Sequence, residues 1–113
     1  MINNSFRNFV KSSKGKSVKM VKGISRKTLA YSDKQMVVEF TFRKGSSTPH
    51  HSHPHEQIGY LVKGKLRYQI GNKEDIVESG DSFYVPSNVD HANWALEETV
   101  AIDVFCPPRE DYK

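Results

Sequence analysis

Cysteine is nearly absent from this chain. Cys106 is the single one among 113 residues, so no internal disulfide can form. A lone thiol fits a reducing compartment, and residues 1–16 lack the apolar segment of a secretory signal, so we expect a cytoplasmic protein. No apolar run approaches the roughly 18 residues that a membrane span needs, and no internal repeat is present. Core packing alone must therefore stabilise the fold.

Length and composition point to one domain. A single core usually takes about 100 to 150 residues, so two cores in this chain would each be marginal. Apolar residues make up 36% of the chain and aromatic residues 11%, which is enough for a compact interior. We expect one domain over residues 1–113, with a lead-in at 1–17, a barrel at 18–107 and a C-terminal tail at 108–113.

Basic charge gathers at the N-terminal end. The net charge is +4, yet residues 1–34 hold nine Lys or Arg and one acid, whereas the rest holds eight basic and twelve acidic residues. Nucleic-acid binding needs aromatic residues among the basic ones or a reading helix, and residues 10–27 have neither. We therefore expect no nucleic-acid partner. The lysines more simply indicate a solvated segment whose charges keep the first strand from pairing with other chains.

Beyond residue 17, short apolar or alternating runs are separated by turn residues, and none shows helical spacing over ten or more positions. This pattern predicts an all-β fold of successive antiparallel hairpins, with turns such as Lys63-Gly64 and Gly71-Asn72. So many short strands must close into a barrel or a double-sheet jelly roll to avoid exposed edges. Residues 3–10 could form one helical turn with Phe6 and Phe9 on one side. The expected strands are 18–21, 25–30, 35–43, 57–62, 65–70, 73–77, 82–85, 91–95 and 99–105.

Histidines cluster in residues 45–64 (GSSTPHHSHPHEQIGYLVKG), which hold four of the chain's five. In an extended segment side chains alternate between faces, so His51 and His53 point the same way, with Cα atoms about 7 Å apart, and can converge on one metal ion. The same parity favours Gln57 over Glu56 as the next ligand. His91, reached through the intervening hairpins, is the natural third imidazole.

Two other histidines are less well placed for a metal. His50 has the opposite parity, and His55 follows Pro54, so we expect surface or supporting roles for both. A chance histidine tract on the surface, without metal, is the alternative for the whole cluster. The later His91 argues against that alternative.

Two segments of the chain, residues 45–57 (GSSTPHHSHPHEQ) and 80–91 (GDSFYVPSNVDH), resemble the two motifs of the cupin superfamily. The resemblance implies a double-stranded β-helix barrel, a cupin-type jelly roll. It also implies that one divalent metal ion is held by four residues: His51, His53, Gln57 and His91.

The chain departs from the usual cupin motifs at two positions. Gln57 stands where an acid is common, and Asn88 stands where a glycine is common. Asn is the non-glycine residue best able to adopt positive φ, so Asn88 can make the same turn. With four neutral ligands a divalent ion keeps its full charge, and Ni, Fe, Mn, Zn or Co would each fit.

The C-terminal stretch DVFCPPREDY offers three more candidate groups. Asp103 and Phe105 share one face of the last expected strand, and Arg109 follows Pro107-Pro108. By themselves these are equally an acid at a strand end, a core phenylalanine and a surface arginine. Together with HSHPHEQIGYLVKG, however, the stretch resembles the small cupins of pectin degradation.

This second resemblance implies linearisation of 4,5-unsaturated galacturonate, or related uronates from pectin or alginate, to open-chain 5-keto-4-deoxyuronate. Arg109 would pair with the sugar carboxylate, Asp103 would move the protons, and Phe105 would present an apolar wall. Tyr60 or Trp94 could line the site likewise, although core packing is the more ordinary role for both.

Two further functions stay open. One is a quercetinase-like dioxygenase, because histidine-rich sites with open positions can hold Fe(II) and activate oxygen. The other is a non-catalytic small-molecule binder, since one fold hosts many chemistries. We expect a small-molecule partner in each case, and no membrane. An exposed N-terminal strand and the resemblance both favour a homodimer in which residues 18–31 pair with the second subunit.

Overall fold

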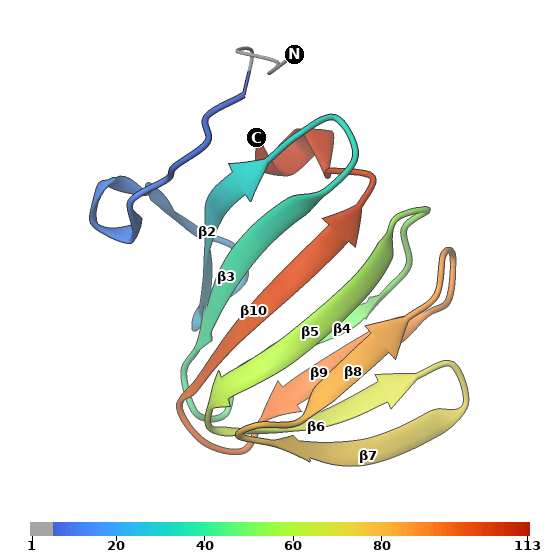
Figure 1. The fold of residues 1–113 in the computed structure, drawn as a ribbon. Coiled ribbons are helices and arrows are strands. Elements are labelled where there is room, and N and C mark those ends of the chain that lie inside the picture. The colour runs from blue at the N-terminus through green and yellow to red at the C-terminus, as the bar shows by residue number, and fades with distance from the viewer. Residues whose placement is uncertain (1–5) are drawn as a thin grey trace.

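Two antiparallel β-sheets face each other and form a barrel (Figure 1). The structure is a computed structural model that describes residues 6–113. Its strands are β1 (Ser17–Lys19), β2 (Ile24–Tyr31), β3 (Met36–Phe42), β4 (Ser47–His51), β5 (Glu56–Lys63), β6 (Lys65–Ile70), β7 (Lys73–Glu78), β8 (Ser82–Val85), β9 (His91–Ala95) and β10 (Thr99–Cys106). One sheet has the order β1-β2-β3-β10-β5-β8, and the other has the order β4-β9-β6-β7.

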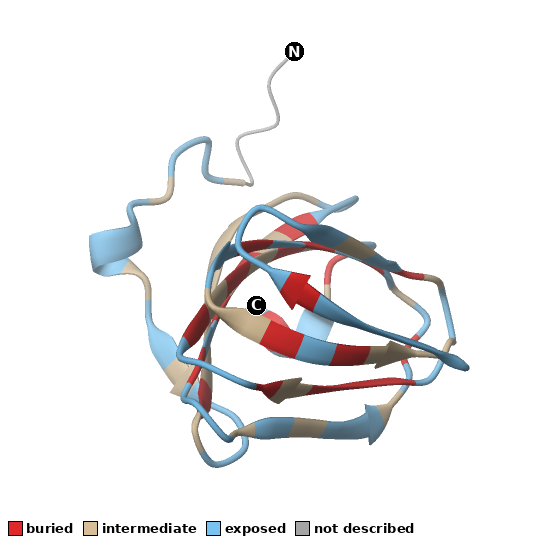
Figure 2. Ribbon diagram, turned by 90° about the horizontal axis from the view of Figure 1, so that it is seen from below, coloured by how far each residue is buried: buried red, intermediate tan, exposed pale blue. Residues whose placement is uncertain are grey.

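One face of each sheet fills the barrel interior. Every second residue of β10 from Thr99 to Phe105 is buried, and β5 alternates likewise from Gln57 to Leu61 (Figure 2). Burial of a large apolar side chain contributes about 1.5–3 kcal/mol, so this interior is the main source of stability. Its large apolar side chains with an exposure of 0–1% are Met36, Val38, Leu61, Leu66, Val85 and Phe105.

The all-β jelly roll is confirmed, and each expected strand is present with ends within two residues of the prediction. Strand β4 is not predicted, because Pro49 and the histidines interrupt the apolar alternation there. The expectation of hairpins throughout is wrong. Neighbouring strands pair in β1–β2, β2–β3 and β6–β7, whereas the other connections pass from one sheet to the other. Turn residues determine where the chain reverses direction. Which strands then lie side by side depends on how the chain passes between the two sheets.

The N-terminal segment contains no α-helix within the described residues. Of the helical turn expected at 3–10, residues 3–5 lie outside that range, and from Phe6 onward the prediction is wrong. Phe9 is 83% exposed, while the Phe6 ring contacts Tyr31 edge-on with centroids 6.1 Å apart. A single turn with so little apolar contact cannot offset the cost of helix nucleation. A short 3-10 helix, η1 (Ser12–Lys14), follows instead.

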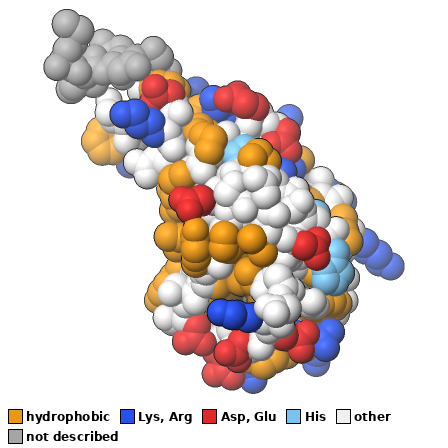
Figure 3. Space-filling model, turned by 90° about the vertical axis from the view of Figure 1, so that its right-hand side faces the viewer, with side chains coloured by type: hydrophobic (Ala, Val, Ile, Leu, Met, Phe, Trp, Pro, Cys, Tyr) orange, Lys and Arg blue, Asp and Glu red, His pale blue; other side chains and the backbone are white. Residues whose placement is uncertain are grey.

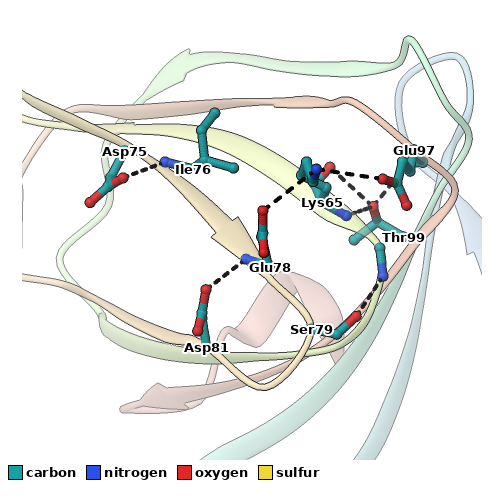
Figure 4. A network of polar contacts seen from close by, with 9 residues as sticks. Lys65, Asp75, Ile76, Glu78, Ser79, Asp81, Glu97 and Thr99 are labelled. Atoms are coloured by element: carbon teal, nitrogen blue, oxygen red, sulfur yellow. Dashed lines mark hydrogen bonds and ion pairs between the residues drawn. The ribbon is translucent and has the colours of Figure 1, made fainter.

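Polar contacts close the end of the barrel where β5 meets β6 (Figure 4). The Lys65 amine lies 3.5 Å from the Glu78 carboxylate and 3.8 Å from that of Glu97. The Lys65 backbone N–H donates to the Thr99 hydroxyl at 3.1 Å, and the Gly64 N–H donates to Ser79 at the same distance. These contacts join the turns after β5, β7 and β9. The histidines lie at the opposite end, where β5 begins.

The C-terminal residues pack back onto the barrel. The 3-10 helix η2 (Glu110–Tyr112) brings Tyr112 into the core, where the side chain is 8% exposed. Its backbone carbonyl accepts a hydrogen bond from the Thr28 hydroxyl at 2.5 Å, and the Arg26 guanidinium lies 4.2 Å from the ring centroid. The tail thus forms part of the wall near the histidines. Within residues 6–113, no helix has the length and apolar character needed to cross a membrane.

Candidate metal centre

The histidine cluster forms where a β-bulge changes the direction of side chains on β4. Thr48 pairs with Asn93 of β9, and His51 pairs with His91, so three steps along β4 match two along β9. A bulge of this kind re-aims the side chains that follow it. Both Thr48 and His51 therefore line the same cavity, whereas regular alternation from Thr48 would have turned His50 inward.

The structure brings three histidines together. One ring nitrogen from each of His51, His53 and His91 lies within 4.8 Å of the other two. The Nδ1 atoms of these rings contact backbone carbonyls at 2.9, 3.0 and 2.9 Å, on Pro49, His55 and Val89 respectively. Because a carbonyl only accepts, each Nδ1 carries the proton and each Nε2 keeps a lone pair. Imidazoles oriented in this way are typical metal ligands.

Gln57 directs a fourth lone pair at the cluster. It is 6% exposed, and its Oε1 lies 3.1 Å from His53 Nε2. Its amide nitrogen donates to Asp103 Oδ2 at 2.5 Å, so the amide oxygen faces the histidines. Two lone pairs this close repel each other unless a cation lies near both. Glu56, in contrast, is exposed and accepts a hydrogen bond from Tyr84 at 2.7 Å.

These donors fit a divalent metal ion. His91 Nε2 is buried without a hydrogen-bond partner, which leaves its lone pair available. Burial lowers the pKa of His91 to about 4. Burial also lowers the pKa of His53, and the nearby Arg109 guanidinium adds to the effect. At pH 7 both rings are therefore neutral, as metal ligation requires, and the three-histidine cluster could hold an ion.

Asp103 of β10 reaches the same cavity. Its side chain is 2% exposed, and its Oδ1 has no hydrogen-bond partner. Burial raises the pKa of Asp103 to about 7, although the hydrogen bond from Gln57 opposes the shift. A buried carboxyl group with one free oxygen and a pKa near neutrality is suited to take up and release a proton.

Phe105 and Arg109 form another part of the cavity wall. The Phe105 ring is 1% exposed and lies edge-on to His53, with centroids 5.8 Å apart. The Arg109 guanidinium lies 4.1 Å from the centroid of Tyr112 and 3.2 Å from the Asp111 carboxylate. Its side chain is only 15% exposed, so the charge is held at the cavity rather than free in solvent.

His50 and His55 lie outside the cluster. His50 is exposed, and its Nδ1 lies 2.8 Å from the Asp90 carboxylate. His55 contributes its backbone carbonyl to His53. Asn88 adopts a φ of 63°, the positive value expected for it, and its N–H donates to the His53 carbonyl at 2.8 Å. This bond joins the two motif segments directly.

Tyr60 and Trp94 do not line the cavity, so site lining, the less ordinary of the two roles considered for them, is wrong for both. Tyr60 is 50% exposed, on the face of β5 opposite Gln57, so core packing is wrong for it as well. Trp94 lies on the outer side of β9 under the Arg67 guanidinium, 4.2 Å from the ring centroid. The residues that do line the cavity include Tyr68 and Asn93, neither of which belongs to a predicted motif. Asn93 could have been predicted, because it lies two residues after His91 on a strand and therefore points to the same face.

Barrel and site together define a cupin. The chain belongs to the cupin family, since residues 38–105 match its domain. It is similar to the pectin degradation protein KdgF of Dickeya dadantii (strain 3937), with 38% identity over 92 residues that cover 80% of this chain and 84% of that protein.

Solved structures agree with this assignment. KdgF from Halomonas sp. has a TM-score of 0.89 and 30% identity, and the match covers 95% of this chain and 99% of the other. An RmlC-like cupin from Shewanella frigidimarina NCIMB 400 has a TM-score of 0.90 and 30% identity, with 95% and 96% covered.

Proposed function

We propose that this protein is a metal-dependent enzyme that opens the ring of 4,5-unsaturated uronates from pectin or alginate breakdown, giving open-chain 5-keto-4-deoxyuronate. One observation carries the proposal. Asp103 and Arg109 share a cavity with His51 and His91 of the three-histidine cluster, in a chain that is 38% identical to a pectin degradation protein over 92 residues. A proton carrier, a cation for the sugar carboxylate and a metal site are the parts that this reaction uses.

The proposed ligands of one divalent metal ion are His51, His53, Gln57 and His91. Three Nε2 lone pairs and an amide oxygen suit a transition metal such as Ni, Fe, Mn, Zn or Co. Because all four ligands are neutral, the bound ion would supply Lewis-acid polarisation at full charge. Gln57 cannot accept a proton, so proton transfer falls to another residue.

Arg109 is proposed to bind the carboxylate of the sugar. Its guanidinium already pairs with a carboxylate, that of Asp111, whose side chain is 63% exposed. An entering uronate can displace so exposed a partner, since surface ion pairs contribute little. Two parallel N–H···O bonds would then fix the orientation of the sugar. Phe105 would provide an apolar wall beside it.

Asp103 is proposed to carry the proton. Ring opening removes the proton of the anomeric hydroxyl, breaks the bond between C1 and the ring oxygen, and adds a proton at C4 of the enol ether. C1 becomes an aldehyde and C5 a ketone, and the composition does not change. One carboxylate can therefore accept the proton at the hydroxyl and return it at carbon. The free Oδ1 of Asp103 supports this role.

Incubation of the metal-loaded protein with 4,5-unsaturated galacturonate tests the proposal. The ultraviolet absorbance of the enol ether should decay faster than in buffer, without uptake of oxygen. No acceleration would contradict the proposed activity. Oxygen consumption with a flavonol would then favour a quercetinase-like dioxygenase, and binding of the uronate without turnover would favour a non-catalytic binder.

We place this activity in the cytoplasm, because the exposed unpaired thiol of Cys106 fits a reducing compartment. We also propose a homodimer. The edge offered by β1 is a poor contact for it, since the strand has three residues and includes Lys19.

The outer face of the six-stranded sheet offers a better dimer contact. Its β5 and β8 carry four side chains that are 50–56% exposed: Ile58, Tyr60, Val62 and Tyr84. Figure 3 shows hydrophobic side chains gathered in the middle of one side of the molecule. Glu56 and Lys63 lie at opposite ends of β5. A two-fold axis through this face would bring Glu56 of one copy near Lys63 of the other.

A further inference from the structure

A row of polar side chains crosses the four-stranded sheet next to the histidines. Thr48 of β4 pairs with Asn93 of β9, and Asn93 pairs with Tyr68 of β6. All three line the cavity that His51, His91 and Asp103 share. Directly paired residues in a sheet have side chains on the same face, so this row is one surface.

Asn93 presents a buried acceptor in this row. The residue is 6% exposed, and its Oδ1 has no hydrogen-bond partner. Asn93 lies directly opposite Tyr68 across β9 and β6, and both side chains line the cavity. The amide nitrogen is the group that can donate to this phenol, which leaves the amide oxygen directed elsewhere. A buried carbonyl without a donor is unfavourable, so the site is arranged for a hydrogen-bond donor.

A second free acceptor faces the cavity from the other sheet. Asp103 Oδ1, on β10, also lacks a partner. Two acceptors repel carboxylate and phosphate groups but favour hydroxyl groups, which donate. The cavity has a volume of about 50 Å³, so individual hydroxyl groups of a ligand can reach these acceptors.

We propose that Asn93, oriented by Tyr68 and flanked by Thr48, forms a hydroxyl-binding subsite for a polyhydroxylated ligand. The inference rests on the proposed function. It adds which hydroxyl groups of the sugar the two acceptors bind. Asp103 meets the anomeric hydroxyl, and Asn93 Oδ1 accepts a hydrogen bond from the hydroxyl on the next ring carbon. Asn93 is thus a specificity residue for the C2 hydroxyl.

Binding of unreactive probes tests the subsite apart from turnover. Galacturonate has no enol ether, so its affinity and that of 2-deoxygalacturonate can be measured by calorimetry on the metal-loaded protein. The native protein should bind galacturonate at least about tenfold more tightly, because loss of the hydroxyl leaves a buried acceptor unpaired. Asn93→Leu should abolish this difference while the metal content stays unchanged.

A matched control is Gln69→Leu, which removes an amide from the residue beside Tyr68 on the opposite face of β6 and should keep the full discrimination. If Asn93→Leu does not fold, Asn93→Ala makes the same test without added bulk. Equal affinities in the native protein, or discrimination that survives the Asn93 variants, would overturn the inference. Discrimination without turnover of the unsaturated sugar would instead count against the proposed function alone.

Discussion

Gln57 connects the histidine cluster to Asp103. Its amide oxygen lies 3.1 Å from His53 Nε2, and its amide nitrogen donates to Asp103. Parity along β5 was sufficient to prefer Gln57 to Glu56, because neighbouring strand residues point to opposite faces. Parity could not predict the contact with Asp103, which depends on β5 pairing with β10 and placing Gln57 opposite Phe105.

Replacement of Asp103 separates proton transfer from metal binding. We expect Asp103→Ala to lower kcat by about 10²–10⁴-fold, the usual contribution of a general acid or base. Metal content should be retained, since Asp103 is not one of the proposed ligands. Steady-state kinetics and metal analysis of the purified variant check both points. Full activity in Asp103→Ala would exclude the proposed mechanism.

The ligand assignment has its own test. His53→Ala and His91→Ala should each purify with little metal, because each removes one of three converging imidazoles. Glu56→Ala is the matched control and should keep its metal, since the Glu56 carboxylate is exposed and bonded to Tyr84. Elemental analysis of the three variants decides the matter, and loss of metal from Glu56→Ala would transfer the fourth ligand from Gln57 to Glu56.

Among the elements, β4 shows what the sequence pattern cannot predict. Nine strands follow from alternating residues between turns, but β4 contains Pro49 and has no apolar alternation. In its bulge, three residue steps on β4 lie opposite two on β9. This mismatch is a property of the pairing rather than of either strand. The same limit applies to the hairpins, which exist in fewer places than the turn residues suggest.

The loop before β9 depends on one backbone conformation that the sequence does predict. At Asn88 φ is 63°, a value that costs about 1–2 kcal/mol for residues other than Gly, Asn and Asp. Asn88→Ala should therefore lower the free energy of unfolding by about 1 kcal/mol, whereas Asn88→Gly should change it little. Urea unfolding of the two variants provides the comparison. Equal stability of both variants would show that the turn relaxes.

For the whole molecule, one outer sheet face stays without a partner in the single chain. Ile58 and Tyr60 point away from Gln57 on β5, and the strand pattern does not say whether a second subunit covers them. The exposed apolar side chains on β5 and β8 support the proposed homodimer.

A charged substitution on this face tests the dimer. Tyr60→Glu should convert the proposed dimer to a monomer in light scattering after size-exclusion chromatography, because two carboxylates would then meet at the axis. Ile76→Glu is a matched control on β7, where the native side chain is 41% exposed on the other sheet. A native protein that is monomeric at micromolar concentration would refute the dimer.

The outward direction of the three Nδ1–H groups implies an order of events. Each donates to the carbonyl of Pro49, His55 or Val89, so the inner surface of the cluster presents only electron pairs. Until a metal ion is bound, these electron pairs repel the oxygen atoms of a sugar, whereas Arg109 attracts its carboxylate. The metal should therefore bind first, and the metal-free protein should bind uronate more weakly than the metal-loaded protein when both are measured by calorimetry.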